Sequence, residues 1–164
     1  MDTLYHRNAI VTGASRGIGV YIARALAREG MNIALVARSL PPIEQLANQL
    51  CNAGVRAIAI RADVAEAASR SMLLQRAAAE LGPIDVLVNN AAVESNEAFA
   101  EFSPSVIEQT VHVDLIAPML LTREILPAML SRKQGHVINI ASLAGKSPTA
   151  FNVPYSARRS SVAA

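Results

Sequence analysis

Three glycines near the N-terminus have the spacing of a loop that binds phosphate. They belong to residues 12–19, which read TGASRGIG. Glycine lets the backbone turn tightly and approach a ligand closely, and the free N–H groups at the start of a helix attract an anion. The segment therefore predicts a phosphate-binding loop formed by Gly13, Ser15, Arg16, Gly17, Ile18 and Gly19.

The residues on either side of this loop are the ones that such a site needs. Residues 8–12 are mostly apolar and β-branched, which is typical of a buried parallel strand. From Ile18 onward, apolar residues recur at helical spacing. The loop is thus expected to join the end of a strand to the start of a helix.

The same strand–helix alternation continues along the whole chain. Strands are expected at residues 9–12, 32–37, 57–61, 85–89 and 136–140, and helices at 17–29, 42–53, 65–81 and 104–130. This order predicts an α/β fold, a Rossmann-like doubly wound parallel sheet in three α/β/α layers, as a single domain over residues 1–164. Pro118 and Pro127 each remove a backbone donor from the long helix, so a kink or break is expected there, near Asp114.

Composition excludes several classes of function. Of the 164 residues 52% are hydrophobic, yet no apolar stretch is long enough to span a membrane, and the N-terminus lacks the features of a signal peptide. The net charge of +2 comes from scattered arginines with few aromatic residues, which does not favour nucleic-acid binding. Cys51 is the single cysteine and is expected in the core, and no metal-ligand spacing is present. A reducing cytoplasm is the expected location.

Taken in order, the motifs resemble those of the short-chain dehydrogenase/reductase family. The resemblance rests on the glycine segment, Asp63-Val64, the Asn-Asn-Ala-Ala run at 89–92, Ser142 and Tyr155. Ser142 and Tyr155 also stand thirteen residues apart, as the serine and tyrosine of that family do.

The resemblance implies hydride transfer between a nicotinamide cofactor and a small-molecule alcohol or carbonyl, as in 3-oxoacyl reductases. It makes Tyr155 the acid/base group and Ser142 the donor to the substrate oxygen. Arg159 stands where the family has a lysine, and it keeps a positive charge one helical turn from Tyr155. Asp114 stands where the family has an asparagine; it either pairs with Arg159 or is a solvated acid on a helix.

The family's members are usually longer than this chain. By resemblance the last strands of the fold and the loop over the substrate are therefore absent. Residues 136–140 then form an exposed edge strand.

Charge favours NADP(H) over NAD(H) as the cofactor. Arg38 follows the second expected strand, where an acidic residue would select NAD, and Arg16 lies in the glycine loop. By resemblance Asp63 and Val64 lie near the adenine, although Asp63 could simply cap the following helix. Asn90 and Ala91 are expected to line the adenosine side, or to form an ordinary turn after a strand.

The sequence is consistent with three functions. The first is an NADP-dependent reductase or dehydrogenase, expected to be a homo-oligomer that associates through the helix at residues 104–130. The second is a non-catalytic module that binds a nucleotide, and the third is a structural subunit that dimerises.

Overall fold

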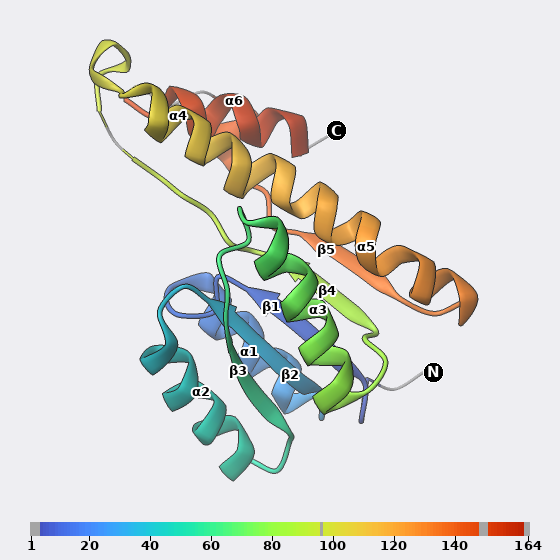
Figure 1. The fold of residues 1–164 in the computed structure, drawn as a ribbon. Coiled ribbons are helices and arrows are strands. Elements are labelled where there is room, and N and C mark those ends of the chain that lie inside the picture. Colours follow the sequence, from blue (N-terminus) through green and yellow to red (C-terminus); the bar gives the residue numbers. More distant parts are fainter. Residues whose placement is uncertain (1–3, 96, 148–150, 163–164) are drawn as a thin grey trace.

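A five-stranded parallel sheet forms the centre of the computed structural model, which describes residues 4–95, 97–147 and 151–162, with side chains up to residue 157. The strand order β3-β2-β1-β4-β5 runs outward from β1 in both directions, so the sheet is doubly wound as expected (Figure 1). Its strands are β1 (Asn8–Thr12), β2 (Asn32–Ala37), β3 (Ala57–Arg61), β4 (Val86–Asn89) and β5 (His136–Asn139).

Helices connect successive strands and cover the sheet (Figure 1). They are α1 (Ile18–Arg28), α2 (Leu40–Asn52), α3 (Ala67–Leu81), α4 (Pro104–Val111), α5 (Ala117–Ser131) and α6 (Val153–Val162). Two short 3₁₀ turns, η1 (Phe99–Glu101) and η3 (Leu143–Gly145), and a π turn, η2 (His112–Ile116), complete the described elements. None of the described helices is long and apolar enough to cross a membrane.

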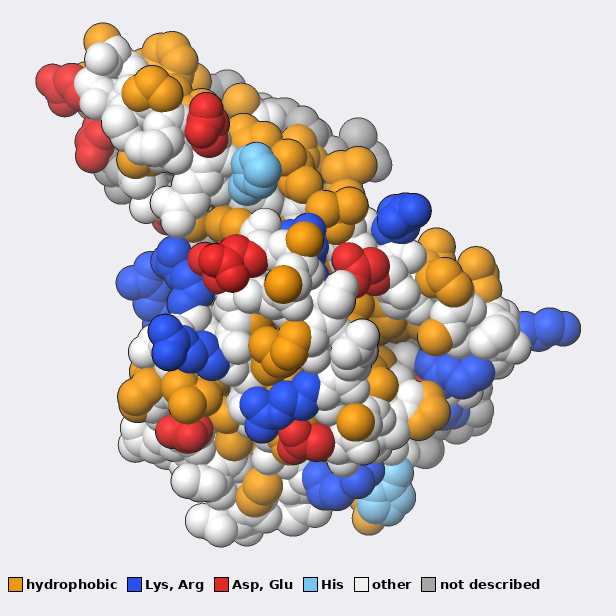
Figure 2. Space-filling model, viewed as in Figure 1, with side chains coloured by type: hydrophobic (Ala, Val, Ile, Leu, Met, Phe, Trp, Pro, Cys, Tyr) orange, Lys and Arg blue, Asp and Glu red, His pale blue; other side chains and the backbone are white. Residues whose placement is uncertain are grey.

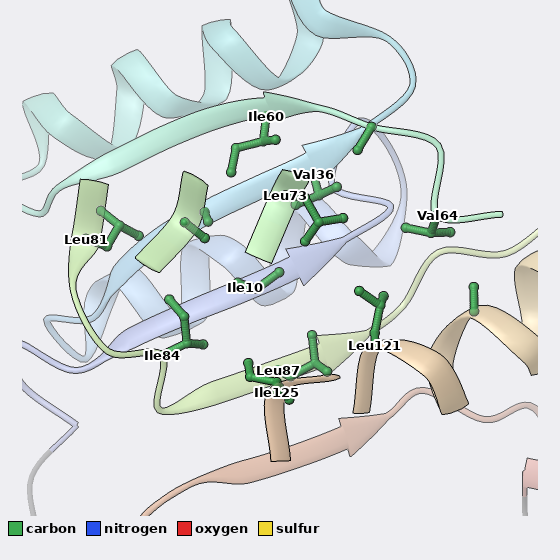
Figure 3. Packing of buried hydrophobic residues seen from close by; sticks show 14 of the residues in the cluster. Ile10, Val36, Ile60, Val64, Leu73, Leu81, Ile84, Leu87, Leu121 and Ile125 are labelled. Carbon is green, nitrogen blue, oxygen red and sulfur yellow. The ribbon is translucent and has the colours of Figure 1, made fainter. Parts of the chain in front are cut away.

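Each face of the sheet is buried under its own helices, which confirms the three-layer arrangement. On one face Ile10, Val36 and Ile60 pack against residues of α3 and α5, such as Leu73 and Leu121 (Figure 3). The other face packs against α1 and α2. Because β1, β2 and β4 are buried on both faces, their sequences are almost continuously apolar rather than alternating.

The strand β5 lies at one edge of the sheet, as expected. It pairs only with β4 among the described strands, and most of its residues are exposed, including Ile138 at 42%. An exposed apolar edge of this kind can pair with another chain.

Pro118 shapes the junction between α4 and α5. Since proline has no N–H, it cannot donate to the carbonyl of Asp114, four residues earlier. At this point the helix widens into the π turn η2, and the N–H of Ala117 donates to the carbonyl of His112, five residues back. The expected disturbance near Asp114 is therefore confirmed, whereas α5 continues without a break through Pro127.

The expectation that Cys51 lies in the core is wrong. Its side chain is exposed, and the thiol contacts the carbonyl of Ala57 at 3.5 Å. The buried face of α2 consists of Ile43, Leu46, Ala47 and Leu50. Cys51 lies about 100° around the helix from Leu50, which turns it away from the sheet.

Asp85 ties the amino-terminal ends of the strands together, opposite the end where the glycine loop lies. Its carboxylate accepts hydrogen bonds from the backbone N–H of Asn8 at 3.0 Å, from Arg132 at 3.1 Å and from Gln134 at 2.5 Å. Burial by itself would raise the pKa of Asp85, but these hydrogen bonds and the charge of Arg132 lower the pKa below its usual value.

Candidate functional site

Most of the expected site residues meet in one cleft at the carboxyl ends of the strands. The cleft has a volume of about 810 Å³, and its walls come from the carboxyl ends of the strands, the segments that follow them, η2 and α6. The expected residues that line it are Gly13, Ser15, Arg16, Gly17, Ile18, Arg38, Asp63, Val64, Asn90, Ala91, Ser142 and Tyr155.

The three glycines have three different structural roles. Gly13 has a φ of +67°, and a Cβ there would lie 2.7 Å from Cα of Ala91. Gly17 caps α1 with a φ of +59°, and a Cβ there would meet nothing within 4 Å. Gly19 does not line the cleft; a Cβ there would lie 2.6 Å from Nδ2 of Asn90, so its role is close packing behind the loop. Of the three, only Gly17 has open space where a Cβ would be.

Thr12 and Asn90 hold the glycine loop against the end of β4. The Thr12 hydroxyl donates to the carbonyl of Val88 at 3.1 Å and accepts from the backbone N–H groups of Asn90 and Ala91 at 3.0 and 3.1 Å. The Asn90 amide nitrogen donates to the carbonyls of Thr12 and Gly13 at 2.9 and 3.2 Å. Asn90 is therefore both a wall of the cleft and the clamp of the loop.

The Asp63–Val64 segment forms a tight turn between β3 and α3. Oδ1 of Asp63 accepts from the N–H of Ala65 at 3.0 Å within this turn. Asp63 does not cap the following helix, because α3 starts at Ala67 and its N-cap residue is Glu66. The buried Arg70 side chain donates to the carbonyl of Val64 at 2.7 Å. Both features hold the turn at the edge of the cleft.

Positive and negative side chains occupy different parts of the cleft. Arg16 in the glycine loop and Arg38 just after β2 are exposed and line it. The other charged lining residues among those described are Asp63, after β3, and Glu94, after β4. An anionic ligand is therefore favoured at the glycine loop and disfavoured near Glu94.

Ser142 and Tyr155 line the cleft on its β5 side. Ser142 precedes the turn η3, and its oxygen accepts from the N–H of Ala144 at 3.2 Å, which leaves the hydroxyl proton available to donate. Tyr155 lies in the first turns of α6 and is half-buried. Arg159 follows one turn later on α6, but its side chain lies outside the described residues, so its pairing with Asp114 stays a prediction.

Asp114 is not a solvated acid, so that alternative is wrong. It lies in the π turn η2 with 1% exposure, and its Oδ1 accepts from the backbone N–H of Val93 at 2.7 Å. Val93 lines the cleft, so Asp114 fixes the course of the chain after β4. The sequence could not show this contact because the two residues come from separate elements.

Glu94 and Asn152 form a pair that the sequence did not indicate. Nδ2 of Asn152 donates to Oε1 of Glu94 at 2.8 Å, and the backbone N–H of Glu97 donates to the carbonyl of Phe151 at 2.9 Å. These bonds join the segment after β4 to the segment before α6, beside Ser142 and Tyr155. Glu94 and Asn152 are 58 positions apart in the sequence, so no local pattern could have revealed the pair.

Comparisons with known proteins agree with this arrangement. The model of the short chain dehydrogenase family matches residues 7–164. A ketoacyl reductase, HetN, from Nostoc sp. is 48% identical over 97% of this chain and 55% of its own length. The oxidoreductase UcpA from Escherichia coli is 38% identical over 88% of this chain and 55% of its own length.

A solved structure gives the same result in three dimensions. The crystal structure of a metagenomic short-chain oxidoreductase in complex with NADP superposes with a TM-score of 0.91 at 37% identity, covering 96% of this chain and 72% of that one. The chain spans about half the length of the two curated relatives.

Proposed function

The chain belongs to the short-chain dehydrogenase family, and from this premise we propose that it binds NADP(H) in the cleft and serves hydride transfer to a carbonyl compound or from an alcohol. The observation that carries the proposal is the composition of this cleft. It brings the helix-capping Gly17 together with Ser142 and Tyr155, from opposite ends of the chain.

The residues around Gly17 suit a dinucleotide phosphate. Gly17 caps α1 and lines the cleft, and beyond its chain neighbours no atom lies within 4 Å of the place that its Cβ would take. The first N–H groups of α1 have no partner within the helix and carry the positive end of its dipole. The pyrophosphate would be held there, and the adenosine would extend toward Asp63, Val64 and Asn90.

The preference for NADP(H) rests on two guanidinium groups. Arg16, in the glycine loop, and Arg38, just after β2, both line the cleft. Guanidinium binds phosphate oxygens in a planar fork, so these two side chains favour a ribose with a 2′-phosphate. The related solved structure is a complex with NADP, which supports the same cofactor.

The chemistry follows from the polar groups on the β5 side of the cleft. When bound, the nicotinamide would supply or accept the hydride. The Ser142 hydroxyl, already fixed by the Ala144 N–H, would donate to the substrate oxygen. The Tyr155 hydroxyl would give or take the proton at that oxygen. The ketoacyl reductase activity in the name of HetN supports a 3-oxoacyl-type carbonyl as the substrate class.

Calorimetric titration of the 164-residue chain with NADPH and NADH tests the cofactor part. We expect NADPH to bind at least about tenfold more tightly, and Arg38→Ser to reduce that ratio while leaving NADH affinity unchanged. Arg61→Ser is the matched control, since Arg61 is an exposed arginine at the end of β3 that does not line the cleft. Equal affinity for the two cofactors in the parent chain would contradict the preference.

A non-catalytic nucleotide-binding role is the second candidate. Asp114 favours this role, because it stands where the family has an asparagine. Its carboxylate accepts a hydrogen bond from the backbone N–H of Val93. NADPH oxidation with a panel of ketones and 3-oxoacyl thioesters separates the two. Turnover that disappears in Tyr155→Phe supports the reductase, whereas NADPH binding without such turnover supports the second role.

The α5 surface supports association with a second copy of the chain. Met119, Leu126 and Leu130 are exposed there by 63%, 40% and 66%, and Figure 2 shows hydrophobic side chains gathered over this helix. Apolar side chains along one helix suit a helix-to-helix contact between copies. Sedimentation of the chain and of Leu130→Glu tests this: we expect a dimer or larger species that dissociates in the variant, and a monomer in both would refute it.

A further inference from the structure

Glu94 gives the substrate end of the cleft a negative charge. It lines the same cleft as Ser142 and Tyr155, and it is exposed rather than buried. The lining arginines, Arg16 and Arg38, follow β1 and β2, whereas Glu94 follows β4, which lies next to β5. Glu94 is also hydrogen-bonded to Asn152, which stands three residues before Tyr155, so it is on the side of the cleft where the substrate oxygen would lie.

Asn152 holds this carboxylate in place. Asn152 is 5% exposed, and its Nδ2 donates to Oε1 of Glu94 at 2.8 Å. A carboxylate can only accept, so this hydrogen bond fixes which end of the amide faces it. The amide oxygen of Asn152 is buried and has no hydrogen-bond partner among the described residues.

Backbone contacts fix both members of the pair. The carbonyl of Asn152 accepts from the N–H of Ser156 in α6, and the carbonyl of Phe151 accepts from the N–H of Glu97. Asp114 holds Val93, which directly precedes Glu94. The carboxylate is thus carried on a segment that is anchored at several points, as a group that discriminates between ligands must be.

Of this pair only Glu94 lines the cleft, and its carboxylate can accept hydrogen bonds but cannot donate one. We propose that Glu94, positioned by Asn152, selects substrates that carry an ammonium or another hydrogen-bond donor near the reacting oxygen, and disfavours substrates that carry a carboxylate there. This inference rests on the proposed function, because the cleft is taken as the substrate site. It adds a specificity determinant to that function.

Three stable ring alcohols test the charge preference without requiring turnover. The probes are trans-4-aminocyclohexanol, 4-methylcyclohexanol and trans-4-hydroxycyclohexanecarboxylate, titrated against the NADPH-loaded chain by ligand-observed NMR. The reduced cofactor cannot oxidise an alcohol, so the measurement reports binding alone. We expect the ammonium probe to bind about tenfold more tightly than the carboxylate probe, since attraction of the first and repulsion of the second each contribute a fewfold change at an exposed charge.

Two variants assign the preference to one residue. Glu94→Gln keeps an acceptor for Asn152 but removes the charge, and should bring the ratio close to one. Glu97→Gln is the matched control: Glu97 is an exposed glutamate on the same segment that does not line the cleft, so the ratio should stay as in the parent. Raising the salt concentration should also reduce the parent's ratio.

The outcomes separate this inference from the proposed function. If NADPH binds, three results overturn the role of Glu94 and leave cofactor binding intact. They are equal affinity for the ammonium and carboxylate probes, no binding of the ammonium probe, and a preference for ammonium that survives Glu94→Gln. If NADPH does not bind, the proposed function fails. The role of Glu94 can then still be tested by the same titration without NADPH. A preference for the ammonium probe that is lost in Glu94→Gln and kept in Glu97→Gln supports that role, and any other result overturns it.

Discussion

Replacing Thr12 with valine removes one hydroxyl on which three backbone groups depend. Thr12 has 1% exposure, and its hydroxyl bonds to the carbonyl of Val88 and to the N–H groups of Asn90 and Ala91. Valine has nearly the same shape, so no cavity forms, but none of the three bonds can be made. The substitution therefore isolates the hydrogen bonds from the packing.

The expected loss follows from how buried these groups are. A buried polar group left without a partner costs about 1–3 kcal/mol. Asn90 and Ala91 are half-buried, so we take the low end for each N–H and add a net bond of about 1 kcal/mol to Val88. Thr12→Val should thus lower the free energy of unfolding by about 3 kcal/mol. It should also weaken NADPH binding, because the Thr12 hydroxyl fixes Asn90 and Asn90 holds the glycine loop.

Thr110→Val is the matched control. Thr110 is 2% exposed, and its hydroxyl donates to the carbonyl of Val106 one helical turn earlier at 2.8 Å. The helix already supplies that carbonyl with a partner, so removal of the hydroxyl should cost less than about 1 kcal/mol. Urea unfolding followed by circular dichroism measures both variants, with m-values checked for a common two-state transition. Equal losses in the two variants would refute the role given to the Thr12 hydroxyl.

Two further predictions concern the loop and the opposite end of the sheet. Gly13→Ala should lower the free energy of unfolding by about 2 kcal/mol more than Gly54→Ala in the same urea titration. Both glycines have a positive φ, but only at Gly13 would the new Cβ meet a backbone atom, at 2.7 Å from Cα of Ala91. Similar losses in the two variants would contradict the close approach. The lowered pKa of Asp85 means that its contribution to stability is complete above the unfolded-state value near 4 and is lost as the pH falls through the lower folded-state pKa. The difference in unfolding free energy between the parent and Asp85→Asn should therefore be constant from pH 6 to pH 8 and shrink below about pH 4, and a difference that grows on acidification would show the opposite shift.

The sequence by itself determined the order of the elements and the place of the cleft. Apolar runs of strand length alternate with helical periodicity, and this local pattern predicts a doubly wound sheet. In such a sheet the segments after the strands meet at one edge, so the glycine loop, Arg38, Asp63, Asn90 and Ser142 had to come together there. The local sequence pattern and the rules by which strands and helices connect in a parallel sheet are sufficient for these inferences.

Several features were decided by the tertiary structure alone. Cys51 faces solvent because the contact between α2 and the sheet covers one stripe of the helix, and a position beside that stripe cannot be assigned from spacing. The contact between Asp114 and Val93 joins the π turn η2 to the segment after β4. The pair of Glu94 and Asn152 depends on where two irregular segments meet. Such contacts join residues far apart in the chain, and they follow from the packing of whole elements, which no local pattern of residues encodes.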